Sequence, residues 1–263
     1  MSERFTDKKS IVSRIIGTLY SGSQSQLRAD WEHWRQQSGI TAIFTPNPEQ
    51  VVQAHHNSAF QTVLLSADVL LADGVGLVWA AKKLLPNTKI ERFSGRKIVQ
   101  WWLQEAQQRQ ISTFLLGSKP GVAQALAQHV DPKQQWCFAS EGYHNIAVPT
   151  VKEKDDIFRL IEVRKPEVMF VAFGAPWQEM WISENKGELQ KRGVKIVMVC
   201  GGAIDTLSPA TPISAPPRLV EKLQMEWFFR LVQEPWRWRR QMRLVEFIKL
   251  VMTEKSGVSD RSG

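Results

Sequence analysis

Short apolar runs alternate with longer amphipathic stretches from the N-terminus to about Gly202. Short runs rich in β-branched and aromatic residues are typical of strands, whereas apolar residues at three- and four-residue intervals are typical of helices. The short runs predict strands at Ile11–Thr18, Ile40–Thr45, Val69–Ala72, Ser112–Leu116, Gln135–Ala139, Val168–Phe173 and Lys195–Cys200. The amphipathic stretches predict helices at Gln24–Gln37, Glu49–Gln61, Gly76–Leu84, Arg96–Arg109, Gly121–His129, Lys152–Arg164 and Trp177–Lys191. This alternation predicts an α/β fold with a largely parallel sheet flanked by helices.

The pattern changes after Asp205. Thr206–Pro217 reads TLSPATPISAPP, and its prolines argue against a helix or a central strand there. Two more helices are expected, Arg218–Gln233 and Trp236–Met252, with Pro235 between them. The sequence thus predicts an α/β catalytic core over residues 1–205, a proline-rich loop over 206–217, a helical appendage over 218–255 and a frayed tail over 256–263.

The composition is that of an ordinary globular protein. The chain has 263 residues, 43% hydrophobic and 23% charged, which suits one large domain or a domain with an appendage. Its longest apolar stretches, Val168–Ala175 and Ile196–Ile204, fall well short of the ~20 residues of a spanning helix, and no secretory signal is seen. We therefore expect a cytoplasmic protein that does not cross a membrane. Cys137 and Cys200 have no metal-ligand spacing and are expected to be reduced core thiols.

The net charge of +8 favours an anionic partner, which could be nucleic acid, a phosphorylated metabolite or a phospholipid surface. Residues 218–255 hold nine Lys and Arg residues and five Glu residues. Aromatic side chains lie among them at Trp227, Phe228, Phe229, Trp236, Trp238 and Phe247. No known nucleic-acid-reading motif is present, so a nucleic-acid partner is not expected.

The last predicted helix has an apolar face that includes a tryptophan. Its apolar positions are Trp238, Met242, Val245, Ile248 and Met252. Arg239 and Arg243 lie beside this face. Such a pattern is typical of a helix that lies on an anionic membrane, which makes the membrane surface an expected partner. A helix that packs its apolar stripe on the core would show the same pattern, so both interpretations stay open.

Small and polar residues recur directly after the predicted strands. In Rossmann-like parallel sheets, ligands bind at the carboxyl ends of the strands, so a site is expected at this edge. The residues at these positions are Thr45, Pro46, Asn47, Asp73, Gly74, Gly117, Ser118, Lys119, the segment Gly174–Glu179, Gly201, Gly202 and Asp205. Any single glycine here is more simply explained by a strand–helix turn, so the recurrence carries the prediction.

Asp73 is the sharpest single candidate. It follows four apolar residues, so the chain carries it from the interior to the rim of the sheet. A carboxylate there can act as a general base that takes a proton from an attacking hydroxyl. An equally good explanation is an N-cap for the helix that follows. Asp68 precedes the same strand and is expected at the opposite edge.

Other ligand motifs are weak or absent. The turn in Leu115–Gly121 could offer N–H groups to a phosphate but matches no nucleotide-binding motif. Asp73–Trp79 has only the first two glycines of the dinucleotide motif, so a nicotinamide enzyme is disfavoured. No Asp-x-Asp sequence occurs, so there is no sign of a metal–diphosphate clamp. Neither a cofactor nor a metal is therefore expected.

A series of short motifs occurs in the order found in one enzyme family. They are Thr45-Pro-Asn47, Ala67-Asp68, Asp73-Gly74, Arg92-Phe-Ser-Gly95, Leu116-Gly117, Glu141-Gly-Tyr143, Gly174-Ala-Pro-Trp-Gln-Glu179, Gly201-Gly-Ala-Ile-Asp205, Ala215-Pro216, Glu226-Trp227, Arg230-Leu231 and Glu234-Pro-Trp-Arg237. From roughly Ser13 to Val251 the chain resembles the WecG/TagA/CpsF glycosyltransferases, also called glycosyltransferase family 26. It departs from them at Ser208–Ser214, where relatives usually have a glycine and a basic residue, and thus lacks one candidate diphosphate contact.

The resemblance implies a metal-independent, inverting transferase in bacterial surface polysaccharide synthesis. The donor would be a UDP-linked hexose or N-acetylhexosamine, or its uronate, and the acceptor a sugar on a polyprenyl diphosphate. The enzyme would lie on the inner face of the cell membrane, and a homo-oligomer is left open. Two other functions also stay open: a nucleotide-sugar epimerase or reductase with a Rossmann core, and a non-catalytic membrane-binding module.

The resemblance also implies roles for individual residues. Asp73 would be the general base, Arg92 would contribute positive charge, and Thr45, Asn47 and Gln178 would line the site. The expected substrate-binding residues are Thr45, Asn47, Arg92, Gly117, Gln178, Asp205, Arg230, Arg237 and Arg240. The last three belong to the basic appendage, which could close over the site and meet the developing diphosphate charge in place of a metal.

Overall fold

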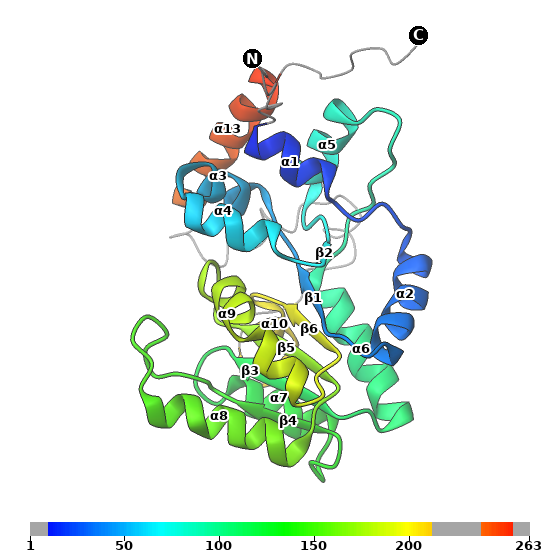
Figure 1. Cartoon of the computed structure of the whole chain (residues 1–263), viewed down its shortest axis with the longest axis vertical. Helices are drawn as coiled ribbons and strands as arrows, with labels where there is room; N and C mark the ends of the chain where they lie inside the picture. The colour runs from blue at the N-terminus through cyan, green and yellow to red at the C-terminus, as the bar shows by residue number, and fades with distance from the viewer. Residues whose placement is uncertain (1–9, 212–237, 255–263) are drawn as a thin grey trace, which may run out of the picture.

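The computed structural model describes residues 10–211 and 238–254. Within these ranges the centre is a six-stranded parallel sheet in the order β2-β1-β6-β5-β3-β4 (Figure 1). The strands are β1 Thr41–Phe44, β2 Val69–Leu70, β3 Thr113–Gly117, β4 Cys137–Ser140, β5 Val168–Ala172 and β6 Ile196–Val199. Every residue of β5 and β6 is buried, as strands covered on both faces should be. The predicted α/β fold with a parallel sheet is confirmed.

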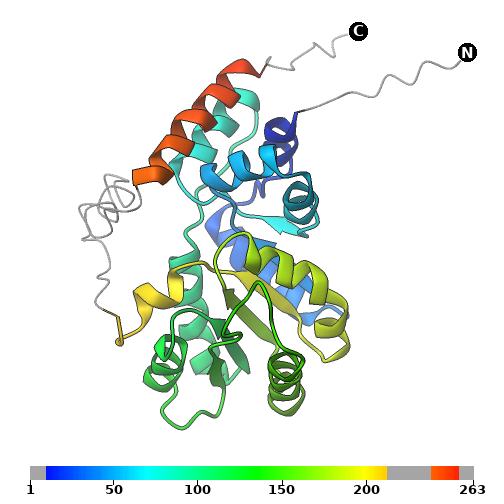
Figure 2. The same cartoon turned by 90° about the vertical axis from the view of Figure 1, so that its left-hand side faces the viewer.

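Helices cover both faces of this sheet. In the described part of the chain they are α1 Ile11–Gly17, α2 Gln24–Gln36, α3 Pro48–His56, α4 Ser58–Leu65, α5 Val75–Leu84, α6 Gly95–Arg109, α7 Val122–Val130, α8 Val151–Arg164, α9 Trp177–Lys191, α10 Ala203–Leu207 and α13 Trp238–Thr253. One buried cluster joins the sheet to α1, α3, α4, α5, α8, α9 and α13. The other joins it to α2, α6, α7 and α10. Figures 1 and 2 show α1, α3, α5 and α13 gathered at one end of the molecule.

The strand predicted at Ile11–Thr18 is wrong, because this segment forms helix α1. Its buried residues lie at helical rather than alternating spacing, at Ile11, Val12, Ile15 and Ile16. Ser10 caps the helix, since its hydroxyl oxygen accepts a hydrogen bond from the Ser13 N–H at 3.2 Å. Packing of one helical stripe against α3 and α5 therefore outweighs the β-branched composition that suggested a strand.

The single helix predicted over Glu49–Gln61 is divided at Asn57 into α3 and α4. Asn57 has an extended backbone, with φ −131° and ψ 101°, which ends α3. Its side-chain oxygen then accepts a hydrogen bond from the Phe60 N–H at 3.0 Å and caps α4. Asparagine is among the preferred N-cap residues, and here that preference interrupts an otherwise helical pattern.

The other predicted elements between residues 24 and 200 agree with the structure to within a few residues. Helix α10 was not predicted, and it includes Thr206 and Leu207, which had been assigned to the loop. The last predicted helix is present as α13, whereas Arg218–Gln233 lies outside the described residues, so the division into core and appendage stays a prediction. Cys137 and Cys200 are free and buried, as expected.

Helix α13 packs on the core through Phe247 and Val251, both buried against α3. The packing also reaches α5 at Gly76. A Cβ atom on Gly76 would lie 2.6 Å from Pro48 Cγ and 3.7 Å from Phe247 Cε1. There is thus no room for even a methyl group at the point where α3, α5 and α13 meet.

Polar contacts fix α13 at several points along its length. Arg243 Nη1 lies 2.9 Å from Glu49 Oε1 on α3, and Glu246 pairs with His56 at the end of α3. At the other end, Glu254 accepts hydrogen bonds from Ser10 and Ser13. Contacts with α1 and α3 therefore set the position of α13.

A second stripe of α13 is exposed. It consists of Met242, Val245, Ile248 and Met252, which are 42–62% exposed. The apolar face predicted from the sequence is therefore not the face that packs on the core. No helix within residues 10–211 and 238–254 has the length and apolar character needed to cross a bilayer.

Replacing the buried aromatic of α13 tests this packing. We expect Phe247→Ala to lower the free energy of unfolding by about 3–5 kcal/mol, because it opens a cavity under the helix. Met242→Ala on the same helix should change it by less than about 0.5 kcal/mol, since Met242 is 62% exposed. Urea denaturation followed by circular dichroism measures both. Equal effects of the two substitutions would contradict the packing.

Candidate active site

The segments that follow β1 and β2 run beside the segment that precedes α6. The Asp73 N–H donates to the Pro46 carbonyl oxygen at 2.9 Å, and the Phe93 N–H donates to the Ala72 carbonyl oxygen at 2.8 Å. Asp73 thus lies between the turn that holds Asn47 and the segment that holds Arg92. The parallel sheet brings these three predicted site residues to one edge, as the sequence suggested.

Asp73 is half-buried at this edge and is not the cap of α5. Gly74 occupies the N-cap position of α5, so Asp73 lies one residue before the cap. Gly74 has φ +88°, a conformation that favours glycine and turns the chain from β2 into α5. The alternative explanation of Asp73 as a helix cap is therefore wrong. Asp68 lies at the opposite edge, where it accepts the Ala42 N–H at 2.6 Å and pairs with Lys186.

Asn47 has a structural task in addition to its predicted one. Its side-chain oxygen accepts the Gln50 N–H at 3.0 Å, and the Asn47 N–H donates to Gln50 Oε1 at 3.1 Å. These two bonds form a capping box at the start of α3. They commit Asn47 Oδ1 to the helix, so a ligand would meet the side-chain amide nitrogen.

A buried polar network joins this turn to the ends of β5 and β6. Glu179 Oε1 accepts a hydrogen bond from Gln50 Nε2 at 2.7 Å and another from Gln178 Nε2 at 2.9 Å. Gln178 Oε1 in turn accepts the Gly201 N–H at 3.3 Å. Gln50, Gln178 and Glu179 are all at least nine-tenths buried. The network therefore links α3, α9 and the turn after β6 beneath the carboxyl edge.

Glu179 is the residue of this site that the sequence did not single out. It lies in the first turn of α9, where an acidic residue is ordinarily an exposed partner of the helix dipole. Here it is completely buried, and burial raises the pKa of its carboxyl group despite hydrogen bonds from the two glutamines. Only the three-dimensional contact with Gln50, 129 positions away along the chain, distinguishes it from an ordinary helix-start acid.

Gly117 and Asp205 lie at the same edge, where a hydrogen bond joins the turns that hold them. Ser118, next to Gly117, donates from its hydroxyl to Asp205 Oδ1 at 3.2 Å. The Gly121 N–H, a candidate phosphate donor, already donates to Glu141 Oε1 at 2.8 Å. A phosphate at that turn would meet a carboxylate, which disfavours the turn as a phosphate cradle.

Of the four arginines predicted to bind the substrate, only Arg92 has a side chain within the described residues. Arg92 is half-buried in the segment beside Asp73. Arg240 lies in α13, but its side chain is not described, and Arg230 and Arg237 lie outside the described residues. Their roles stay predictions. Among the residues that are described, no group of three or more His, Cys, Asp or Glu side chains is arranged to hold a metal ion.

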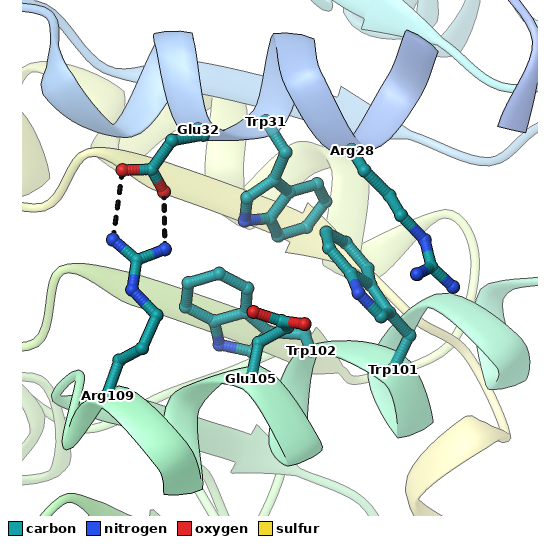
Figure 3. Close-up of a pocket in the computed structure, with 7 residues that line it drawn as sticks. All are labelled: Arg28, Trp31, Glu32, Trp101, Trp102, Glu105 and Arg109. Atoms are coloured by element: carbon teal, nitrogen blue, oxygen red, sulfur yellow. Dashed lines mark hydrogen bonds and ion pairs between the residues drawn. The ribbon is translucent and has the colours of Figure 1, made fainter. Parts of the chain in front are cut away.

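Two surface pockets contain none of the residues predicted to be catalytic or substrate-binding. Figure 3 shows one of about 120 Å³ between α2 and α6, where Glu32 and Arg109 form a two-bond ion pair beside Trp31, Trp101 and Trp102. The other, of about 230 Å³, is lined by residues that include Tyr143, Trp177 and Trp181, and it lies next to the start of α9. Thr45, Asn47, Asp73 and Gly117 instead follow or end the strands at the carboxyl edge of the sheet.

Comparison with known proteins supports the motif pattern. The model of the WecG/TagA/CpsF glycosyl transferase family matches residues 14–261. An N-acetylglucosaminyldiphosphoundecaprenol N-acetyl-beta-D-mannosaminyltransferase of Bacillus subtilis (strain 168) is 28% identical over 228 residues, covering 85% of this chain and 84% of the relative. A protein of the same name from Bacillus spizizenii (strain W23) is 29% identical over 213 residues, covering 80% and 78%.

The turn after β3 tests how tightly this edge is built. Gly117 has φ +98°, and a Cβ atom there would lie 2.8 Å from the Phe173 ring. We expect Gly117→Ala to lower the free energy of unfolding by more than about 1 kcal/mol. Gly187→Ala, inside α9 with nothing within 4 Å, should instead raise it by up to about 1 kcal/mol. Urea denaturation measures both variants. An unchanged free energy of unfolding in Gly117→Ala would disprove the tight packing.

Proposed function

Because the chain belongs to the WecG/TagA/CpsF glycosyltransferase family, we propose that it transfers a sugar to a polyprenyl-linked acceptor. In this proposal a UDP-linked hexose or N-acetylhexosamine, or its uronate, is the donor, and a sugar on polyprenyl diphosphate is the acceptor. The names of the two Bacillus relatives support an N-acetylglucosamine acceptor and an N-acetylmannosamine donor sugar. The transfer would proceed with inversion and without a metal.

The observation that carries this proposal is the placement of Asp73. It is a strand-end carboxylate that does not occupy the N-cap position of α5, and it lies between the Asn47 turn and the Arg92 segment. In an inverting transfer, an acceptor hydroxyl oxygen forms a bond to the anomeric carbon as the bond to UDP breaks. Asp73 would take the hydroxyl proton on the face opposite the leaving UDP. The leaving UDP would carry away the bonding electron pair.

Positive charge and backbone dipoles would stabilise the leaving diphosphate. Arg92 is one candidate, because its segment runs beside Asp73. Arg230, Arg237 and Arg240 of the basic appendage would supply further charge. Thr45, buried at the end of β1, and Gln178, buried at the start of α9, would shape the floor of the site.

We also propose that α13 lies against the anionic inner face of the cell membrane. Its exposed stripe of Met242, Val245, Ile248 and Met252 offers apolar area, and its sequence carries Arg239, Arg240, Arg243 and Lys249. Such a helix binds an anionic bilayer through apolar burial and electrostatic attraction together. The opposite stripe packs on α3, so membrane contact would hold the carboxyl edge close to the lipid-linked acceptor.

Replacing Asp73 tests the catalytic part. We expect Asp73→Asn to lower kcat by about 10²- to 10⁴-fold with a polyprenyl-diphosphate-GlcNAc analogue and UDP-ManNAc, because the base is lost. UDP binding, measured by calorimetry, should persist. Asp68→Asn, the matched control at the opposite edge, should retain most of the activity. Other UDP-sugars are assayed in the same way, in case the donor is not UDP-ManNAc.

Three results would contradict the catalytic proposal. Full activity of Asp73→Asn would remove Asp73 from the mechanism. Turnover of a UDP-sugar without any acceptor would instead indicate an epimerase or reductase. The absence of transfer with every donor would contradict transfer to the GlcNAc-bearing acceptor.

Vesicle binding tests the membrane part. We expect the double substitution Val245→Glu and Ile248→Glu to weaken binding to phosphatidylglycerol vesicles by at least about 10-fold, because it places carboxylates in the apolar stripe. The control is Val163→Glu, which adds a carboxylate on α8 at a valine that is 72% exposed. This variant should bind the vesicles nearly as the wild type does. Sedimentation with vesicles measures both. Equal binding of all three proteins would disprove the membrane role of this stripe.

A further inference from the structure

We infer that Glu179 is a positioning residue of the transferase site, which holds the side chains of Gln178 and Gln50 in the arrangement that receives the substrates. This inference rests on the proposed function. It concerns a residue that lies beneath the carboxyl edge and does not reach the surface, since Glu179 is completely buried. Glu179 therefore acts on the substrates only through its neighbours.

The geometry concentrates two hydrogen bonds on one oxygen atom. Both glutamine amides donate to Glu179 Oε1, Gln50 from α3 and Gln178 from α9. The far end of each glutamine is also used, because Gln50 Oε1 accepts the Asn47 N–H and Gln178 Oε1 accepts the Gly201 N–H. The turns after β1, β5 and β6 are thus tied together through a single carboxyl group. These three strands are neighbours in the sheet.

The second carboxyl oxygen shows that stability alone does not explain Glu179. Glu179 Oε2 is buried and has no hydrogen-bond partner in the part of the chain that the structure describes. Leaving a buried polar atom unsatisfied costs about 1–3 kcal/mol. Burial also raises the pKa of the group, because it disfavours the charged form. What the carboxyl group contributes in return is the fixed orientation of two amides.

The orientation matters most for Gln178. An amide nitrogen carries two hydrogens, and Glu179 uses one of those on Gln178 Nε2. The other hydrogen then has a fixed direction, set by bonds at both ends of the amide group. Without Glu179 the amide could rotate, and the site would lose a preorganised donor. Gln50 passes the same constraint to Asn47 through the capping box.

A comparison of two substitutions at position 179 tests the inference. Glu179→Gln keeps an oxygen acceptor for both amides and should retain kcat/KM within about threefold. Glu179→Leu removes the acceptor and should lower kcat/KM by about 10- to 100-fold, mainly in kcat, as misplacement of site groups does. Glu188→Leu makes the same change at an exposed position of α9 and should have little effect, because it breaks only surface ion pairs.

A double-mutant cycle shows whether Glu179 acts through Gln178. In a Gln178→Ala background, Glu179→Leu should cause little further loss, because the amide that it orients is gone. Additive losses would overturn the inference. A Glu179→Gln variant as impaired as Glu179→Leu would also overturn it, since the acid itself would then be required. If Glu179→Leu does not fold, Gln50→Leu takes its place in the cycle with Gln178→Ala.

A readout without turnover separates this inference from the proposed function. The side-chain amide signals of Gln178 and Gln50 in ¹⁵N–¹H spectra should shift in Glu179→Leu and stay in place in Glu188→Leu. Unchanged signals in Glu179→Leu would contradict the positioning role even if the enzyme is a transferase. If the wild type transfers no sugar, the proposed function fails, and the spectra still decide whether Glu179 orients the two amides.

Discussion

Parallel strands end at the same edge of a sheet, and the register of β1 with its neighbours decides which residues meet there. Phe44 of β1 lies opposite Leu70 of β2, and Ile43 lies opposite both Val69 of β2 and Met198 of β6. The residues that follow these strands therefore emerge together. A shift of one residue in this pairing would turn Asp73 away from the Asn47 turn and would break the bond from the Asp73 N–H to Pro46.

The same constraint explains why much of the site could be predicted from the sequence. A strand covered on both faces is a continuous apolar run, so the polar residue that ends it, such as Asp73, stands out. The α1 segment shows the limit of this argument, because its isoleucines suit a strand by composition and a helix by spacing. Asn57 shows another limit, since one side chain ends one helix and caps the next within an unbroken amphipathic pattern. Glu179 could not be predicted, because its burial depends on Gln50 from a distant part of the chain.

Helix α13 presents two apolar stripes to two different surroundings. Phe247 and Val251 pack on α3, and Met242, Val245, Ile248 and Met252 remain exposed. From the sequence, the stripe of Met242, Val245, Ile248 and Met252 could contact either a membrane or the core. In the structure the core contact is made by Phe247 and Val251 instead, and the exposure of the first stripe supports the proposed membrane contact. Since α3 begins at the Asn47 cap and packs on α13, one helix connects the proposed active site to the helix that carries the proposed membrane surface.

The crowded point at Gly76 has a consequence for how this sequence can change over evolutionary time. Position 76 admits no larger residue while Pro48 and Phe247 occupy their present places. A larger residue there requires a smaller one at 48, so we expect positions 48 and 76 to covary among relatives. Because Pro48 directly follows Asn47 and Gly76 lies three residues after Asp73, this crowding couples the sequences of the two turns that hold the proposed active-site residues.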